Sequence, residues 1–314
     1  MSLVDKILSE EDKEILRGSV DLHVHCGPES IPAKIDAIDL ARQIVEYDMK
    51  AAVVKNHSAE TSSWAVLASK FYGRCIYGSV TLNWDVGGIN RYAVRAALGP
   101  TLFGESLLRI IWMPTLHSEW MLERQRRQGK KEDIPKGFAG GSRGGISLEE
   151  IRPIKLNEYA TEFEVVLDMI AKNDLVLATG HISPLEISTA IDLAKTHDVK
   201  KIIVTHPIWP SATDSFSDDH IREFAKKGAF IEFVAYASIK DRKAFSRTVK
   251  LIQVIGSERC ILSSDLGRPQ EPIPALGLLR FARDLIEAGI SRSDVFTMLK
   301  TNPSHLLGID CIHS

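Results

Sequence analysis

Two histidines one residue apart, His23 and His25, are the residues of this sequence best suited to metal chemistry. They lie in the run 21–25, DLHVH, where polar and apolar residues alternate. On a β-strand the side chains at positions i and i+2 point to the same side, so both imidazoles would project together. Neighbouring imidazoles are a common ligand pair for a transition metal. A His-x-His pair also occurs by chance, so its weight depends on the rest of the chain.

Further candidate ligands stand at the ends of short apolar runs later in the sequence. They are His181, His206 and Asp265. Each has an ordinary structural alternative: a histidine that hydrogen-bonds beside a helix, a residue that simply ends a strand, or an aspartate that caps a turn. Four histidines and one aspartate at equivalent positions are hard to attribute to chance, and together they predict a metal site.

The elements that must position these residues follow a regular alternation of short β-branched runs and longer amphipathic segments. Strands are predicted for the runs 20–25, 51–57, 75–82, 109–115, 174–181, 201–207, 229–236 and 260–267. These runs are apolar on both faces, as parallel strands buried on both sides are. A helix is predicted after each one; after His181, for example, Ser183 and Glu186 form a capping box and Pro184 takes the first helical position.

Eight strand–helix pairs indicate an α/β protein, either a closed (β/α)8 TIM barrel or an open doubly wound sheet. The barrel is favoured because it brings the carboxyl ends of all its strands to one rim, whereas an open sheet would spread the candidate ligands along a row. The first strand also lacks a following Gly-x-Gly-x-x-Gly motif, which weakens a nucleotide-binding interpretation. We expect residues 1–314 to form a single barrel domain, with a short N-terminal helix within 1–18.

The same residues resemble the pattern of the amidohydrolase superfamily of metal-dependent hydrolases: His-x-His on strand 1, His on strands 5 and 6, and Asp on strand 8. The segment 302–309, NPSHLLGI, is similar to that superfamily's common Asn-Pro-Ala-x-x-Leu-Gly-Leu segment, and the resemblance covers residues 19–309. It extends to an uncharacterised subgroup with no assigned substrate. The resemblance implies that Asp265 is both a ligand and the proton-transferring residue. The implied metal ligands are His23, His25, His181, His206 and Asp265.

One part of the superfamily pattern is missing. Two-metal members commonly bridge their ions with a carboxylated lysine or a glutamate at the end of strand 4, but residues 112–117, WMPTLH, contain neither, and Glu119 lies beyond. Lys55, which shares a strand face with His57, is the alternative candidate. A lysine inside a barrel rim needs a partner that offsets its desolvation. Three roles are open for Lys55: a carboxylated ligand that bridges two ions, an ammonium that binds an anionic substrate group, or the partner of a carboxylate. One or two ions are therefore compatible with the sequence.

A long insertion, 116–157, interrupts the repeat after the fourth strand, and loops of this length are often lids or binding loops. Its charged part, 123–137, is typical of a solvated helical face. Its glycine-rich part, 140–145, can approach a ligand closely. We expect a lid that brings Arg143 toward a carboxylate or phosphate of the substrate, together with Arg268 from the loop after Asp265. An arginine without function in a flexible loop is the alternative.

The overall composition is that of an ordinary globular protein, with 44% hydrophobic residues, 25% charged residues and a formal net charge of -2. The near-neutral charge argues against nucleic acid or an anionic membrane as a partner, and no apolar run is long enough to span a bilayer. The N-terminus lacks a secretory pattern, and the four cysteines are widely spaced, which favours a cytoplasmic protein with reduced thiols. We expect a small-molecule partner, and self-association into a homo-oligomer is also compatible with the sequence.

These features predict a metal-dependent hydrolase with one or two divalent ions, zinc first and manganese, nickel or iron as alternatives. Asp265 would move the proton of a metal-activated water, and His206 or His57 would stabilise the oxyanion. The expected bond is an amide, a lactone or another C–N or C–O bond of a small, anionic substrate. The alternatives are a phosphoesterase, a metal-dependent lyase or decarboxylase, and a metal-binding protein without turnover.

Overall fold

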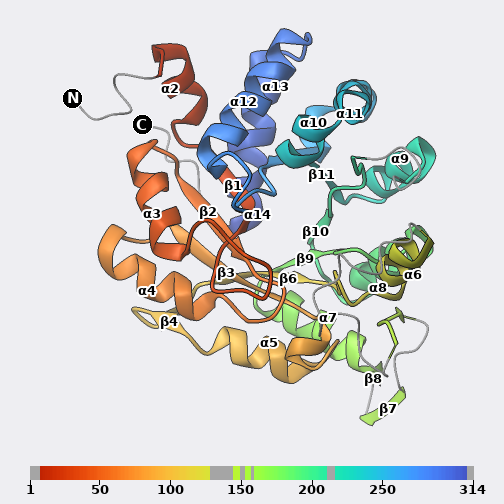
Figure 1. The fold of residues 1–314 in the computed structure, drawn as a ribbon. Helices are drawn as coiled ribbons and strands as arrows, with labels where there is room; N and C mark the ends of the chain where they lie inside the picture. Colours follow the sequence, from red (N-terminus) through yellow and green to blue (C-terminus); the bar gives the residue numbers. More distant parts are fainter. Residues whose placement is uncertain (1–7, 128–143, 149–152, 157–158, 211–215, 310–314) are drawn as a thin grey trace.

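The structure, a computed structural model, describes residues 8–127, 144–148, 153–156, 159–210 and 216–309. Its centre is one eight-stranded sheet of parallel strands that follow one another in chain order, and helices surround it (Figure 1). The strands are β1 (Val20–His25), β2 (Ala51–Lys55), β3 (Ile76–Thr81), β6 (Leu108–Trp112), β9 (Val176–Ala178), β10 (Lys201–Val204), β11 (Phe230–Val234) and β12 (Cys260–Ser263).

The segment after β12 closes the sheet against β1. The His25 backbone N–H donates to the Leu266 carbonyl at 2.9 Å, and the Asp265 N–H donates to the His23 carbonyl at 2.9 Å. Gly267 makes this close approach possible, because a Cβ there would lie 1.9 Å from the His25 carbonyl oxygen and its φ is +135°. The predicted (β/α)8 barrel is therefore confirmed.

One helix follows each barrel strand and packs an apolar face on it. The predicted capping box of Ser183 and Glu186 is present, and Gly228, Gly256 and Gly289, which follow helices, all have positive φ. The eight outer helices are α3 (Ala37–Glu46), α4 (Ser62–Tyr72), α5 (Arg91–Leu98), α7 (Glu162–Lys172), α8 (Pro184–Thr196), α9 (Asp218–Lys226), α11 (Arg242–Ile255) and α12 (Pro274–Glu287).

Smaller elements complete the described chain. At the two termini and in the loops there are α2 (Glu10–Leu16), α10 (Ala235–Lys240), α13 (Arg292–Phe296), α14 (Asn302–Leu307), the short helices η1 (Trp84–Val86), η4 (Ser257–Arg259) and η5 (Thr297–Thr301), and the hairpin of β4 (Thr101–Leu102) and β5 (Glu105–Ser106). Helix α2 lies within the segment 1–18 for which a short helix was predicted, and residues 1–7 lie outside the described part.

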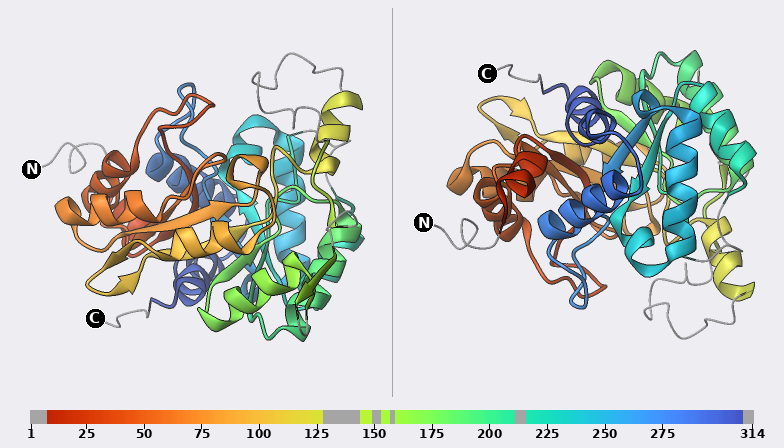
Figure 2. Two further views of the ribbon diagram at one scale, coloured as in Figure 1. Left: turned by 90° about the horizontal axis from the view of Figure 1, so that it is seen from below. Right: turned by 90° about the horizontal axis from the view of Figure 1, so that it is seen from above.

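The insertion after the fourth barrel strand contains α6 (Glu119–Arg127) and ends in an antiparallel pair, β7 (Pro153–Leu156) and β8 (Tyr159–Thr161). In both views of Figure 2 the red N-terminal helix α2 lies on the opposite side of the molecule from α6. Arg143 lies outside the described residues, so the lid hypothesis stays a prediction.

The barrel strands are shorter than the sequence runs that predicted them, because their hydrogen-bonded ladders end before the polar residues begin. His57, His181, His206 and Asp265 accordingly lie in loops two or three residues beyond their strands. Within the described residues, no helix combines the length and the apolar character needed to cross a bilayer.

Candidate metal centre

Strand β1 directs His23 and His25 into the barrel. His23 is fully buried and His25 is 6% exposed. The Nδ1 of His23 lies 3.2 Å from both carboxylate oxygens of Glu232 on β11. Its Nε2 faces the barrel centre, 3.0 Å from Asp265 Oδ1, and His25 Nε2 lies 3.1 Å from the same oxygen. The two β1 histidines therefore converge on one carboxylate, as their spacing predicts.

Asp265 reaches this position through an unusual backbone conformation. Its φ is +52°, in the left-handed region that residues other than glycine seldom adopt and that recurs at functional sites. Burial alone would raise the pKa of Asp265, but the surrounding imidazoles of His23, His25 and His206 together outweigh burial and hold that pKa well below the usual range. Asp265 is therefore an ionised carboxylate among imidazoles.

His181 and His206 approach from the loops after β9 and β10. Their Nε2 atoms lie 3.2 Å apart, and His206 Nε2 is 3.9 Å from Asp265 Oδ2. Trp209 packs edge-on against both rings, with centroid distances of 5.1 and 4.6 Å. Burial lowers the pKa of His206 to about 4 and that of His181 well below its ordinary value, so both imidazoles are neutral at neutral pH.

This donor set fits a divalent metal. The ligand atoms of His23, His206 and Asp265 all lie within 4.8 Å of one another. Metal ligands must offer lone pairs, and the neutral imidazoles of His181 and His206 beside the ionised Asp265 do so. The Nδ1 of His181 is also buried without a hydrogen-bond partner among the described residues. Nitrogen and oxygen donors in this combination suit zinc and other first-row metals.

Lys55, the last residue of β2, points at the same centre. Only 1% of it is exposed, its Nζ lies 2.9 Å from His23 Nε2, and the Trp112 ring centroid is 4.3 Å away. Burial lowers the pKa of Lys55 from its ordinary 10.5 to about 8. Within the described part of the chain Lys55 forms no direct ion pair with a carboxylate, so the structure does not show the last of its three predicted roles.

The end of the fourth barrel strand is filled by Trp112. Its fully buried ring lies 4.7 Å from the His23 ring, at the strand end where the resemblance implied a bridging lysine or glutamate. Glu119 does not replace that side chain: its carboxylate accepts from the Gly145 N–H and pairs with Arg126. The bridging position therefore holds an indole rather than a ligand.

A second cluster lies beside His25. The ligand atoms of His25, Glu29 and His57 are also within 4.8 Å of one another. The guanidinium of Arg268 contacts two members of this cluster, with Nη1 2.6 Å from Glu29 Oε2 and Nη2 3.2 Å from His25 Nδ1. The backbone N–H of His57 donates to Glu29 Oε1 at 2.7 Å. A fixed positive charge, Arg268, thus occupies the cluster.

These residues surround a cavity of about 160 Å³ at the rim. Lys55, His57 and Arg268, three predicted site residues, line it, so the structure brings them together with the candidate ligands. Its other walls are partly apolar and come from Leu116, Met121, Trp209 and Tyr236. The cavity therefore suits a small substrate that has one polar or anionic end.

Sequence reasoning missed Glu232, Glu29 and Trp209. Glu232 is the one charged residue in the apolar run 229–236, and a lone charge in a buried strand is a signal of an internal partner. Glu29 and Trp209 lie in loops, where no periodic pattern indicates which way a side chain points. Only the folded chain shows that they face the site.

Solved structures with the same fold include several that are hydrolases by name. An amidohydrolase from Burkholderia multivorans, solved with bound zinc, is 10% identical with a TM-score of 0.59 over 93% of this chain and 99% of that chain. An organophosphorus hydrolase from Deinococcus radiodurans is 14% identical with a TM-score of 0.56 over 93% of this chain and 92% of that chain. A structure engineered for organophosphate hydrolysis from a weak promiscuous lactonase is 15% identical with a TM-score of 0.56, over 93% and 95% of the two chains.

At these identities the likeness is one of fold, the (β/α)8 barrel described above. No curated protein sequence matches this chain. The model of DUF6282, a family of unknown function, matches residues 18–232. The chain belongs to that family.

Proposed function

We propose that this protein is a metal-dependent hydrolase of a small, anionic substrate. The convergence of His23, His206 and Asp265 within 4.8 Å at the carboxyl rim of the barrel carries the proposal. His25 and His181 contact these residues and complete the ligand set. Zinc is the first candidate, in line with the Burkholderia amidohydrolase that binds it, and manganese, nickel or iron are alternatives.

When bound, such an ion lowers the pKa of its water from about 15.7 toward 7 and polarises the bond under attack. The protein supplies the proton transfer. Asp265 Oδ1 is engaged by His23 and His25, so Oδ2 is the oxygen that accepts the proton of the attacking water and delivers it to the leaving group. His57, on the cavity wall, and His206 are placed to stabilise the developing oxyanion.

We propose that Lys55 and Arg268 provide the positive charge that binds the anionic end of the substrate. Both line the cavity, and Arg268 already fills the cluster of His25, Glu29 and His57. This arrangement supports a centre with one ion, in which the guanidinium takes the place of a second. A carboxylated Lys55 that bridges two ions is the alternative; intact-protein mass spectrometry and metal analysis distinguish them.

The bond that is cleaved is expected to be an amide, a lactone or another C–N or C–O bond. The named activities of the structural neighbours, lactonase and organophosphate hydrolase, support a screen that includes lactones and phosphate esters. A phosphoesterase, or a lyase or decarboxylase that uses the same ligands, would be identified by the same screen.

The test begins with elemental analysis of the purified protein, followed by removal of metal with a chelator and reconstitution with zinc, manganese, nickel or iron. Chromogenic amides, lactones and phosphate esters are then assayed with each metal. We expect about one equivalent of metal and turnover in at least one class. Metal binding without turnover would favour a silent metal-binding protein, and a protein that binds none of these metals would refute the proposal.

A further inference from the structure

Glu232 lies in the middle of β11 and has no contact with solvent. Its strand is otherwise apolar, FIEFV, and contributes none of the candidate ligands. Burial of an ionised carboxylate is unfavourable by several kcal/mol unless hydrogen bonds and opposite charge offset it. A glutamate in such a place therefore points to a specific partner inside the barrel.

The partners of Glu232 are two of the candidate metal ligands. Both carboxylate oxygens lie 3.2 Å from Nδ1 of His23. Oε2 also accepts the backbone N–H of His206 at 3.2 Å. One side chain thus connects the ring of His23 on β1 with the loop that carries His206 after β10.

The chemistry of this contact concerns the tautomer of His23. Glu232 accepts a hydrogen bond at Nδ1, so a neutral ring keeps its proton there and its lone pair at Nε2, the nitrogen that faces the barrel centre. A carboxylate that accepts from the distal nitrogen of a histidine fixes the ring and increases the basicity of the metal-binding nitrogen. The distances between Glu232 and His23 fit this orienting role.

We propose that Glu232 is a positioning residue that fixes His23 in its metal-binding tautomer and, through the His206 N–H, sets the distance between these two ligands. The inference rests on the proposed metal centre. It adds a residue from a strand that carries no ligand and assigns it a role in metal affinity rather than in the proton transfer.

A matched pair of substitutions tests this role. Glu232→Gln keeps the shape but removes the charge and one acceptor. Asp21→Asn is the control, because Asp21 is equally buried and contacts the same residue only through the backbone, with Oδ1 3.2 Å from the His23 N–H. Glu232→Asp keeps the carboxylate on a shorter side chain.

Zinc affinity is measured by competition with a chromophoric chelator, and the cobalt-substituted proteins are compared by visible absorption. We expect Glu232→Gln to weaken zinc binding by about 10- to 100-fold and to shift the cobalt bands. Glu232→Asp should recover part of the affinity, and Asp21→Asn should remain within about three-fold of the wild type, a smaller change than the loss of a ligand-orienting contact. Circular dichroism verifies that each variant is folded.

The outcomes separate the two proposals. A wild-type protein that binds no metal contradicts the proposed function. Tight binding by the wild type together with equal affinity and an unchanged cobalt spectrum in folded Glu232→Gln overturns the positioning role. If Glu232→Gln does not fold, Glu232→Asp decides: a weaker affinity with shifted bands supports the role, and wild-type behaviour overturns it.

Discussion

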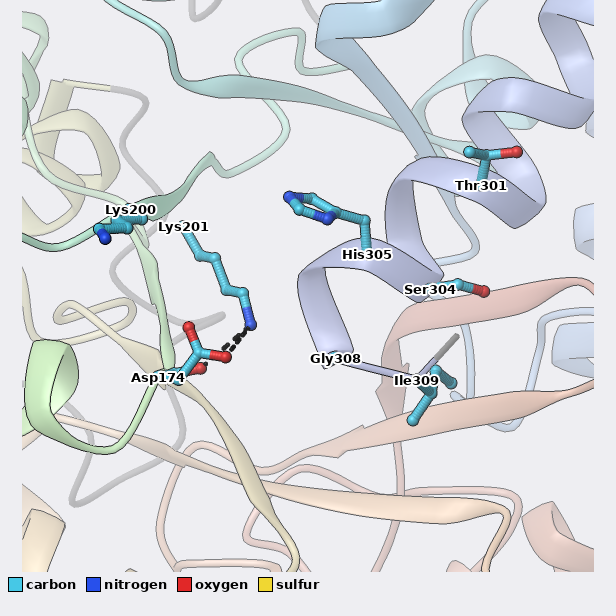
Figure 3. A pocket seen from close by; sticks show the side chains of 8 residues that line it. All are labelled: Asp174, Lys200, Lys201, Thr301, Ser304, His305, Gly308 and Ile309. Atoms are coloured by element: carbon cyan, nitrogen blue, oxygen red, sulfur yellow. Dashed lines mark hydrogen bonds and ion pairs between the residues drawn. The ribbon is translucent and has the colours of Figure 1, made fainter. Parts of the chain in front are cut away.

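The two ends of the barrel each contain a buried lysine beside a cavity, but the two lysines have different surroundings. At the carboxyl end, Lys55 lies against an imidazole and an indole and has no direct carboxylate contact within the described residues. At the amino end, Lys201 opens β10 and points at Asp174, with Nζ 2.6 Å from Oδ2 (Figure 3). Both lysines are at least nine-tenths buried.

The exposure of Asp174, the partner of Lys201, explains why the two lysines have different surroundings. The side chain of Asp174 is 73% exposed, so the carboxylate of the Lys201–Asp174 pair is in contact with water. Both residues line a cavity of about 500 Å³, where the carboxylate neutralises the charge of Lys201. Lys55 is enclosed on all sides, and burial lowers its pKa to about 8. In a barrel, the amino end serves stability and the carboxyl end carries the chemistry. We therefore expect the buried lysine without a direct carboxylate contact, at the carboxyl end, to serve function, and the paired one at the amino end to serve structure.

The largest expected difference between the two ends concerns their aspartates. Asp265→Asn removes the proton acceptor of the rim, and we expect kcat/KM to fall by about 10³-fold or more with the fold retained. Asp174→Asn at the amino end should leave kcat/KM within about two-fold, since it touches no rim residue. Steady-state kinetics on the substrate class found by screening measures both.

Equal losses in the two aspartate variants would contradict the division between the ends. Metal analysis is the control, because a loss of bound metal in Asp265→Asn assigns the effect to ligation rather than to proton transfer alone.

The second-largest expected effect on kcat/KM comes from replacing the two lysines. Lys55→Met removes a positive charge from the cavity wall, and we expect kcat/KM for an anionic substrate to fall by about 10²-fold. The matched variant Lys201→Met should retain wild-type kinetics. Comparison of an anionic substrate with its neutral analogue sharpens this test, since a lost charge contact weakens only the former.

The substitution Lys55→Met, which should lower activity, is expected to raise the stability of the metal-free protein. Below pH 8 the ammonium is present in both the folded and the unfolded chain, so the folded chain bears the full cost of burying it. Between pH 8 and 10.5 the folded chain loses this proton first, and the contribution of Lys55 to the free energy of unfolding rises with pH. Lys55→Met should therefore stabilise the metal-free protein by up to about 3 kcal/mol below pH 8.

Urea unfolding of the metal-free wild type and of Lys55→Met, at several pH values from 7 to about 10.5, measures this gain. The gain in stability of Lys55→Met over the wild type should become smaller as the pH rises from 8 to about 10.5. A gain that does not depend on pH would show that Lys55 is not titrating in the folded chain.

The fold and the ligand set were accessible from the sequence because each depends on a repeated local pattern. Eight apolar runs and the polar residues after them predict a barrel with His23, His25, His181, His206 and Asp265 at one rim, and the structure places them there. The strand ends were predicted too late, because β-branched and apolar residues continue past the last ladder hydrogen bond.

The supporting residues were not accessible in the same way. Glu232 contacts His23, which is 209 positions away in the chain, and Arg268 contacts Glu29 at a separation of 239 positions. Such pairs depend on barrel closure and on loop conformations, which have no periodicity. Trp112 shows a related limit, because the sequence indicates a missing bridging ligand but not that an indole fills its place.

The smallest expected effect is the stability change of Lys201→Met. The substitution retains most of the aliphatic stem, which covers apolar surface, and removes an ion pair whose other member stays hydrated. We expect a loss of about 0.5–1 kcal/mol in the free energy of unfolding, with no change in activity.

The double variant Lys201→Met/Asp174→Asn should be no less stable than either single variant if the pair itself is the source of the loss. A loss above about 3 kcal/mol, the range of a broken buried pair, would mean that water does not screen the Lys201–Asp174 pair and would remove the argument from its exposed partner. The contrast between the two ends would then have to rest on the aspartates alone.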